Sequence, residues 1–478
     1  MDLKKILLNN SSPRQTIIKN IFWLFSGQTI GRLLRALLLI YAARLLGAES
    51  WGAFSYALSI AAFLSIFADL GINAFITKEA SCLENNVKGL IPLASTIKFS
   101  ALIFFIFLTA IISPFISKTE EVKWLILVSL IIFAFDSIRD FGSSLARARE
   151  RMEFESFANI LSNVFIVIFG FTAMALNPTS FYLASGYALG NSIGALFLIF
   201  RLRERFTYFS KNISLKEIKH ILRASLPFCL TAVMGAVMIN SDIVILWWFS
   251  SARETGIYSA AQKPIQLLYL VPSLIAASFF PLMSRLAKTQ KEKFKEITAK
   301  ASSLVILFSL PISLGGIILG SNIINLLYGQ EYAVAALSFK LLAATFVLVS
   351  PSIILGNAAF AAGLEKSLIS YSLAGMLGNI ILDFALIPYF GIAGCALATL
   401  INQLIITAFL KIKIKKATGL LLFPYLKKII FSSFIMSIFT LFLFSLNLNI
   451  LLIIPASAIL YFLLLFFLKE KLLNFQFC

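Results

Sequence analysis

Residues 156–200 read SFANILSNVFIVIFGFTAMALNPTSFYLASGYALGNSIGALFLIF, and they contain no Asp, Glu, Lys or Arg. Asn177-Pro178 divides this stretch into two apolar halves, and an Asn-Pro pair is a turn signal. One helical crossing of a bilayer takes about 20 apolar residues, so each half is long enough for one crossing. The stretch therefore predicts two transmembrane helices joined by a short turn.

The same pattern continues along the whole chain of 478 residues, of which 59% are apolar and only 13% are charged. A soluble domain carries about 25% charged residues, so this composition excludes a soluble enzyme, a disordered chain and a fibrous protein. We expect an all-α membrane protein with about 14 transmembrane helices and no globular domain outside the bilayer. The predicted spans are 20–43, 53–76, 92–116, 123–142, 156–176, 180–200, 222–249, 256–283, 301–326, 336–361, 367–388, 390–410, 427–446 and 449–468.

The net charge of +19 is distributed asymmetrically around these spans. With the N-terminus inside, 33 Lys and Arg residues fall on the inner side and 5 on the outer side, the latter being Arg44, Lys118, Lys123, Arg253 and Lys340. Basic residues favour the cytoplasmic side, so we expect a multi-pass membrane protein with both termini cytoplasmic. The basic loops at 201–223, 285–300 and 411–428 are expected to contact anionic membrane lipids rather than nucleic acid.

Three short motifs recur in the same order at a nearly constant offset. They pair Gly52-Ala-Phe-Ser55 with Gly256-Ile-Tyr-Ser259, Ala158-Asn-Ile-Leu-Ser-Asn163 with Ala374-Gly-Met-Leu-Gly-Asn379, and Gly186-Tyr-Ala-Leu189 with Gly394-Cys-Ala-Leu397. The offset spans six predicted helices, an even number, so both copies insert in the same direction. We expect two pseudo-symmetric six-helix lobes, 1–205 and 206–415, followed by two additional helices in 416–478, with a cleft between the lobes.

Two arginines lie deep in the first predicted span, about 18 and 22 Å along it at 1.5 Å per residue. Arg32 and Arg35 share a helix face with Gln28, and each arginine costs about 2.5–3.5 kcal/mol at a helix centre. In a wet cleft their guanidinium groups would bind the phosphate oxygens of an anionic head group. The alternative is a structural pairing with Asp69 or another helix.

Other polar residues within spans are weaker candidates. Lys263, beside Gln266 on a polar face of the eighth span, would either attract phosphate or extend to the membrane interface. Asp69 is interpreted as a proton or ion site or as the counter-ion of an arginine, and Asp242 as a lobe-packing or coupling residue. The role of Asp383 is open, whereas Asp136, Arg139 and Asp140 are expected to pair locally.

The sequence lacks the motifs of most enzymatic and metal sites. The only histidine is His220, the four cysteines are scattered, and no phosphate-binding glycine loop, nucleophile elbow or metal motif occurs. We therefore expect no catalytic residues, no metal, no cofactor and no enzymatic activity.

Several stretches resemble bacterial polysaccharide (O-antigen type) flippases, within the multidrug/oligosaccharidyl-lipid/polysaccharide exporter superfamily. They are Leu46-Gly-Ala-Glu-Ser-Trp-Gly-Ala-Phe-Ser-Tyr-Ala57, Ala68-Asp-Leu-Gly-Ile-Asn73, Gly256-Ile-Tyr-Ser-Ala-Ala-Gln-Lys263 leading to Phe280-Pro281, and Ile387-Pro-Tyr-Phe-Gly-Ile-Ala-Gly-Cys-Ala-Leu-Ala398. The resemblance implies a fourteen-helix, two-lobe fold in a bacterial inner (plasma) membrane. It also implies movement of an undecaprenyl-pyrophosphate-linked oligosaccharide, an O-antigen or capsule repeat unit, from the cytoplasmic to the periplasmic leaflet through a cationic cavity.

Arg32, Arg35 and Lys263 are the candidates for binding this cargo, and a polysaccharide polymerase and other assembly proteins are further candidate partners. The alternative is an ion-coupled multidrug or cation exporter of the same superfamily. A cationic cargo calls for acidic groups in the cleft, whereas the first span offers arginines and no acid. A membrane polymerase or ligase is disfavoured because the outer loops are short.

Overall fold

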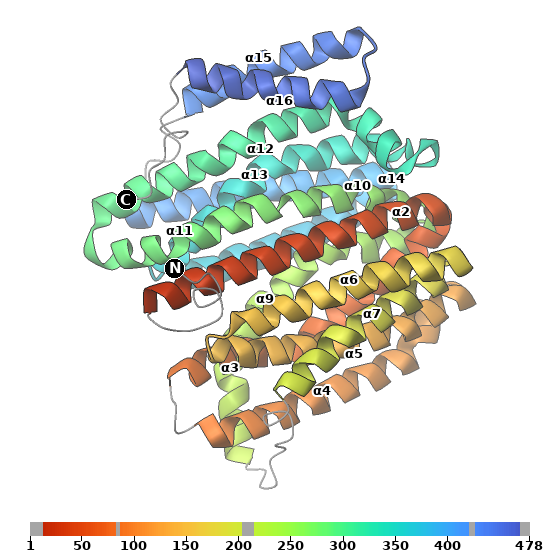
Figure 1. The fold of residues 1–478 in the computed structure, drawn as a ribbon, viewed down its shortest axis with the longest axis vertical. Coiled ribbons are helices and arrows are strands. Elements are labelled where there is room, and N and C mark those ends of the chain that lie inside the picture. The colour runs from red at the N-terminus through yellow and green to blue at the C-terminus, as the bar shows by residue number, and fades with distance from the viewer. Residues whose placement is uncertain (1–12, 83–86, 203–214, 420–425, 469–478) are drawn as a thin grey trace, which may run out of the picture. The chain divides into compact units, whose positions relative to one another are not determined.

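The computed structural model describes residues 13–82, 87–202, 215–419 and 426–468, and within these ranges the regular structure is helical (Figure 1). Within these described ranges, eleven helical segments are long and apolar enough to cross a membrane. Two of them, Phe22–Asp69 and Lys366–Thr418, are kinked helices that each carry two of the predicted spans. The predicted all-α membrane fold is therefore confirmed, with a span count close to fourteen.

Contacts divide the chain into two compact units. The first takes the described residues of Met1–Trp247 together with Ser251–Gly256. Its helices are α2 (Pro13–Asp69), α3 (Ile72–Cys82), α4 (Val87–Ile116), α5 (Glu120–Ala148), α6 (Met152–Leu176), α7 (Ser180–Arg201), most of α9 (Leu215–Phe249) and the first turn of α10 (Ala252–Leu268). The predicted lobe boundary between 205 and 206 lies outside the described residues and stays a prediction.

The second unit takes Trp248–Ser250 and the described residues of Ile257–Cys478. It contains the remainder of α10, then α11 (Leu270–Thr289), α12 (Lys291–Tyr328), the short η1 (Gln330–Tyr332), α13 (Ala335–Ala361), α14 (Glu365–Thr418), α15 (Leu426–Ser445) and α16 (Ile450–Phe467). The chain ends 1–12 and 469–478, and basic loop residues such as Arg203, Arg205 and Lys211, lie outside the described residues.

Two of the predicted spans are divided in the structure. The predicted span 53–76 is interrupted, because Leu70 and Gly71 have φ angles of 51° and 74°, so α2 ends at Asp69. The predicted span 256–283 is divided between α10 and α11. Gly47 and Gly391 kink α2 and α14 at φ angles of 74° and 53°, and both kinks lie at breaks that the sequence predicts, between 43 and 53 and near 390. Hydropathy locates an apolar segment, but a single reversed φ angle decides where its helix bends or ends.

Small residues bring α6 and α7 together in the first unit, as Figure 1 shows for the two neighbouring helices. A Cβ atom on Gly190 of α7 would lie 2.2 Å from the backbone nitrogen of Ile166 in α6, so only glycine fits this contact. Close backbone approach through glycine is typical of membrane helix pairs. This contact fixes the positions of Asn163 on α6 and Tyr187 on α7, both of which contribute to the candidate site.

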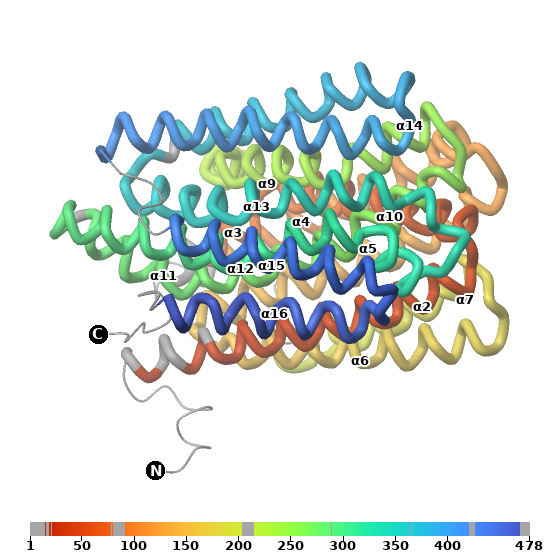
Figure 2. The backbone as a smooth tube through the Cα atoms, turned by 90° about the horizontal axis from the view of Figure 1, so that it is seen from above, coloured from red at the N-terminus to blue at the C-terminus, as the bar shows by residue number. Residues whose placement is uncertain are grey.

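In the second unit, α15 and α16 lie side by side and pack on α12 (Figure 2). Tyr461 of α16 donates a hydrogen bond to the carbonyl oxygen of Leu307 in α12 at 2.7 Å. Thr440 of α15 donates to Ser457 of α16 at 2.8 Å. Large apolar side chains elsewhere on both units, such as Phe107 and Phe466, are exposed, as expected for helices that face lipid.

Candidate functional site

The first candidate surface is the polar face of α2 that carries Gln28, Arg32 and Arg35. Gln28 and Arg35 are half-buried and Arg32 is exposed. Arg32 forms no hydrogen bond or ion pair with another described residue. The guanidinium of Arg32 is thus exposed on a face of α2 that also carries Gln28 and Arg35.

Arg35 is held inside the first unit. Its Nε donates a hydrogen bond to Oδ1 of Asn163 at 2.9 Å, and its guanidinium carbon lies 5.4 Å from the ring centre of Tyr187. A Cβ on Gly31 would lie 2.6 Å from Nδ2 of Asn163, so Gly31 makes room for this amide. The sequence did not indicate Asn163 or Tyr187 as partners of Arg35, because they come from helices more than 120 residues further along the chain.

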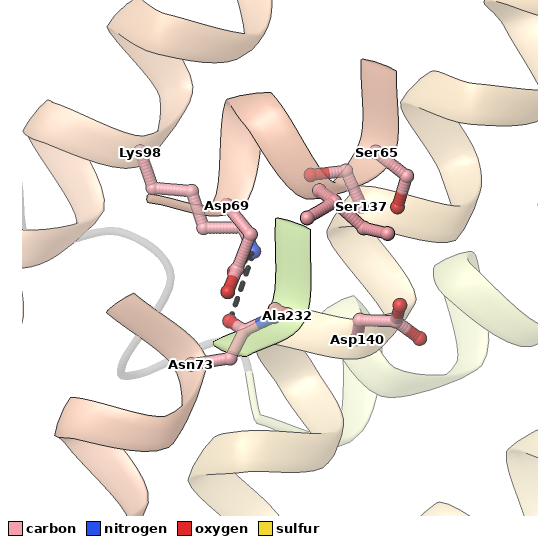
Figure 3. Close-up of a pocket in the computed structure, with 8 residues that line it drawn as sticks. Ser65, Asp69, Asn73, Lys98, Ser137, Asp140 and Ala232 are labelled. Carbon is pink, nitrogen blue, oxygen red and sulfur yellow. Dashed lines mark hydrogen bonds and ion pairs between the residues drawn. The ribbon is translucent and has the colours of Figure 1, made fainter. Parts of the chain in front are cut away.

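The second candidate surface is a polar cavity of about 130 Å³ within the first unit. Figure 3 shows Lys98 grouped with Asp69 and Asn73, while Asp140 lies apart from them. The Nζ of Lys98 lies 2.7 Å from Oδ1 of Asp69 and 2.9 Å from Oδ1 of Asn73. The full lining is Ser65, Ile66, Asp69, Asn73, Lys98, Ser137, Asp140 and Ala232, contributed by α2, α3, α4, α5 and α9.

The turn between α2 and α3 places Asp69 and Asn73 together. A Cβ on Gly71 would lie 2.4 Å from the carbonyl oxygen of Ser225 in α9, so this turn packs against the backbone of another helix. The cation beside Asp69 is Lys98 of α4 rather than an arginine. Lys98 is one of the 33 basic residues predicted to lie on the inner side, and its side chain is only 1% exposed and lies within α4.

The sequence does contain a signal for this ion pair. Asp69 and Lys98 carry opposite charges and lie in neighbouring predicted spans, 53–76 and 92–116. A buried lysine is stable only when a carboxylate compensates for its lost hydration, and Asp69 provides that carboxylate. On the far side of the cavity, Arg139 forms an ion pair with Asp136 and lies 3.5 Å from Asp140. Arg139 also donates to Asn191 of α7 at 2.6 Å, so these charges of α5 are compensated locally, as the sequence predicted.

The remaining candidates belong to α9, α10 and α14. Lys263 and Gln266 are half-buried on α10, close to Pro264, in the second unit. Asp242 of α9 is 1% exposed. The structure therefore brings Gln28, Arg32 and Arg35 together on one face of α2 and Lys263 with Gln266 on α10. Asp69 ends α2, Asp242 lies on α9 and Asp383 on α14.

Asp383 is fully buried in a row of amides on α14. The Nδ2 of Asn379 donates to Oδ2 of Asp383 at 3.0 Å, and the Nδ2 of Asn402 donates to the carbonyl oxygen of Gly375 at 2.8 Å and lies 3.4 Å from Oδ1 of Asn379. The kink at Gly391 folds α14 back on itself and allows these contacts between its two segments. Asp383 is thus positioned by hydrogen bonds within the second unit.

These side chains can bind and orient charged groups. The arginines of α2 supply cationic donors for an anion, and the buried carboxylates can hold a cation or a proton. Among the described residues, no group of three or more His, Cys, Asp or Glu side chains is placed to hold a metal ion.

The fold is similar to that of solved lipid and drug transporters. A lipid II flippase MurJ in an inward closed conformation superposes with a TM-score of 0.76 at 18% identity, over 94% of this chain and 99% of that one. A multidrug resistance MATE transporter in its inward-facing conformation gives a TM-score of 0.64 at 14% identity, over 81% and 96% of the two chains. At these identities the similarity establishes the fold.

Comparison of the sequence with known proteins identifies the family, which the fold alone does not. The capsular polysaccharide biosynthesis protein CapF of Staphylococcus aureus is 22% identical over 404 residues, which cover 81% of this chain and 97% of CapF. The family model described as polysaccharide biosynthesis protein matches residues 17–287, which is more than half of the chain and includes Arg32 and Arg35 of α2. With a helical membrane fold shared with flippases and this match across its first unit, the chain belongs to the polysaccharide biosynthesis protein family of membrane transporters.

Proposed function

We propose that this protein is a flippase that moves an undecaprenyl-pyrophosphate-linked oligosaccharide, an O-antigen or capsule repeat unit, from the cytoplasmic to the periplasmic leaflet. The observation that carries the proposal is the exposed Arg32 beside the anchored Arg35 in an apolar helix. A diphosphate presents several anionic oxygens, and guanidinium groups bind such oxygens in forked pairs. Family membership and the flippase-like fold support the same substrate class.

The transport cycle that we propose is alternating access between two lobes, 1–205 and 206–415. The lipid tail stays in the bilayer while the glycan crosses in a polar cleft, so no covalent bond is broken and no catalytic residue is required. Gln28, Lys263 and Gln266 are proposed to contact the diphosphate or the glycan together with the two arginines. The resemblance to bacterial flippases supports a bacterial inner membrane, and the charge asymmetry of the loops favours both termini in the cytoplasm.

The carboxylates have separate proposed roles. Asp69 serves as the counter-ion of Lys98, which the 2.7 Å contact supports. Asp242 and Asp383 are proposed to couple transport to a cation gradient, because buried carboxylates in membrane helices typically bind protons or cations. Polysaccharide polymerase and other assembly proteins are proposed partners on the outer side.

The direct test is glycan export in a strain that lacks this gene and carries plasmid-borne variants. Arg32→Ala combined with Arg35→Ala is expected to reduce surface glycan at least tenfold and to increase the lipid-linked oligosaccharide in the membrane. Arg44→Ala is the matched control, since Arg44 lies on the same helix, nine residues beyond Arg35 and on the opposite face. Normal export by the double variant, at normal protein amounts, would refute the assigned role.

The alternative function is an ion-coupled multidrug exporter, which the MATE-like fold also allows. A cationic drug would need acidic groups where α2 instead carries arginines, since the first acidic residue of α2 is Glu49. Overexpression is therefore expected to leave resistance to cationic dyes unchanged. Increased resistance that depends on Asp242 or Asp383 would favour the exporter.

A further inference from the structure

Two arginines of the first unit lie over one aromatic ring, where α6 begins and α7 ends. The guanidinium carbon of Arg201, the last residue of α7, lies 4.8 Å from the ring centre of Phe154 in the first turn of α6. The guanidinium carbon of Arg151, which immediately precedes α6, lies 5.6 Å from the same ring centre. Both distances are within the range of about 6 Å for a cation–π contact. Phe154 thus brings together two cations from different helix ends.

The acidic side chains at the start of α6 are engaged with other cations. Glu153 lies 3.0 Å from the Nζ of Lys19, and Glu155 accepts a hydrogen bond from the Nε of Arg147 at 2.7 Å. Glu150, in the turn before α6, forms no ion pair with the two arginines over the ring. The carboxylates of this turn therefore do not neutralise that pair of arginines.

Arg151 and Arg201 keep their positive charges uncompensated. Both side chains are exposed, and neither forms an ion pair with another residue in the described part of the chain. Arg151 is the N-cap residue of α6 and makes no side-chain capping hydrogen bond, so its charge adds to the positive end of the helix dipole. An anion held between the two guanidinium groups would offset this repulsion and accept their N–H donors.

An aromatic surface continues from Phe154 toward the middle of both helices. Phe157 of α6 and Phe197 of α7 lie one turn deeper, with their ring centres 5.1 Å apart. Phe157 is 49% exposed, and Phe200, beside Arg201, is 75% exposed. A free phosphate ion gains nothing from these rings, whereas a lipid can place its phosphate on the arginines and its acyl chains against the rings.

The charge pattern of the loops assigns this helix end to the cytoplasmic side. Arg151 and Arg201 both belong to the 33 basic residues predicted to lie inside. The opposite ends of α6 and α7 are joined by the short turn at Asn177-Pro178. Basic side chains at the cytoplasmic surface attract the phosphate groups of anionic lipids, and basic pockets between membrane helices on that side bind their head groups.

We propose that Arg151, Phe154 and Arg201 form a binding site for the phosphate group of an anionic phospholipid of the inner leaflet, whose acyl chains lie along Phe157 and Phe200. The inference goes beyond the proposed transport function, because this lipid is a bound component of the membrane and not the cargo. The site also differs from the general attraction of basic loops to a membrane, since one ring fixes the position of both guanidinium groups. The arginines bind the phosphate, and Phe154 is a positioning residue.

The test is lipid binding by the purified full-length protein in detergent, measured by native mass spectrometry with added phosphatidylglycerol. Arg151→Gln combined with Arg201→Gln is expected to weaken this binding at least tenfold, because both charged donors are lost. The matched control is Arg223→Gln with Arg285→Gln, which removes two exposed arginines of the same predicted side from two other helices, α9 and α11. The control is expected to bind like the wild type. Equal weakening by the two double variants would mean that only the total charge matters and would overturn the proposal.

A second variant tests the ring without changing any charge. Phe154→Leu keeps an apolar side chain where Phe154 packs against the core of the first unit, but it removes the surface on which both guanidinium groups lie. Phosphatidylglycerol binding is expected to weaken several-fold. Phe165→Leu is the control, since Phe165 is a half-buried ring of the same helix, further from the arginines. Normal binding by Phe154→Leu would refute the positioning role of the ring.

Competing probes identify the source of the phosphate. Inorganic phosphate is expected not to displace phosphatidylglycerol, and Phe157→Ala is expected to weaken lipid binding, because the acyl chains contribute. Displacement by inorganic phosphate at a similar concentration would show a simple anion site and overturn the lipid assignment. Tighter binding of undecaprenyl diphosphate at the same arginines would assign the site to the cargo and would also overturn it. Binding is measured without transport, so failure of the proposed flippase function would leave this inference intact.

Discussion

The Nε of Arg35 donates a hydrogen bond to Oδ1 of Asn163 at 2.9 Å, which ties the deeper arginine of α2 to α6. Asn379 occupies the corresponding place in the second copy of the repeat, 216 residues later, and donates to Asp383 instead. The two copies thus place the same amide in their helices, but one uses it to orient a cation and the other to orient a carboxylate. We expect this difference to separate cargo binding from coupling.

Asn163→Leu is predicted to disturb the position of Arg35 while leaving its charge in place. The lost hydrogen bond to a charged group is worth about 1.5–3 kcal/mol. Surface glycan should fall several-fold at normal protein amount, as measured by glycan staining of complemented deletion cells. Asn159→Leu is the control, because it precedes Asn163 by one turn of the same helix and is half-buried. Equal export by both variants would contradict the positioning role.

Lys98→Met is predicted to destabilise the first unit by about 3 kcal/mol, because it leaves Asp69 without its cation in a largely buried position. The double variant Lys98→Met with Asp69→Asn should recover most of the stability that Lys98→Met loses, because no unpaired carboxylate remains. Thermal unfolding in detergent, followed by fluorescence-detected size exclusion, measures both. The matched control is Lys123→Met, whose pair with Glu120 is exposed and worth about 0–1 kcal/mol. No recovery in the double variant would mean that the Lys98–Asp69 pair is not the source of the loss.

Gly190→Ala is predicted to separate α6 from α7, since the added methyl group would meet the nitrogen of Ile166 at 2.2 Å. Separation of these helices displaces both Asn163 and Tyr187 and should lower melting temperature and export together. Gly356→Ala in α13 meets nothing within 4 Å and should stabilise the protein slightly, by up to about 1 kcal/mol, through helix propensity. A Gly190→Ala protein as stable as the wild type would show that α7 can shift without cost.

Asp383→Asn is predicted to keep the fold but to abolish the dependence of transport on a cation gradient. The side chain keeps its shape, and Asn379 still has an oxygen to which it can donate. Transport into inverted vesicles, measured with and without proton and sodium gradients, tests the change. The control is Glu331→Gln in η1, an acidic residue between α12 and α13 that lies outside the predicted spans. Gradient-dependent transport by Asp383→Asn would exclude Asp383 as the coupling carboxylate.

Much of the fold could be predicted from local properties of the sequence. The uncharged stretch 156–200 predicted two helices with a turn at Asn177-Pro178, and α6 and α7 end and begin on either side of that turn. The break inside the predicted span 53–76 was harder to place, because α2 ends at Asp69 where Leu70 and Gly71 have positive φ angles that hydropathy does not register. The location of Lys98 was misjudged for a related reason, since a charge near the end of a span has the same hydropathy whether it points to water or to a buried carboxylate.

The sequence by itself determined that this is a helical membrane protein with an internal repeat, because apolar length and charge asymmetry are local or additive properties that membrane insertion reads directly. Only the tertiary structure decided that Arg35 is tied to Asn163 while Arg32 stays exposed, that Lys98 pairs with Asp69, and that Arg201 lies over Phe154. These relationships join residues between 29 and 128 positions apart, so they depend on how helices pack, and helix packing is set by the shape of whole faces rather than by any single motif.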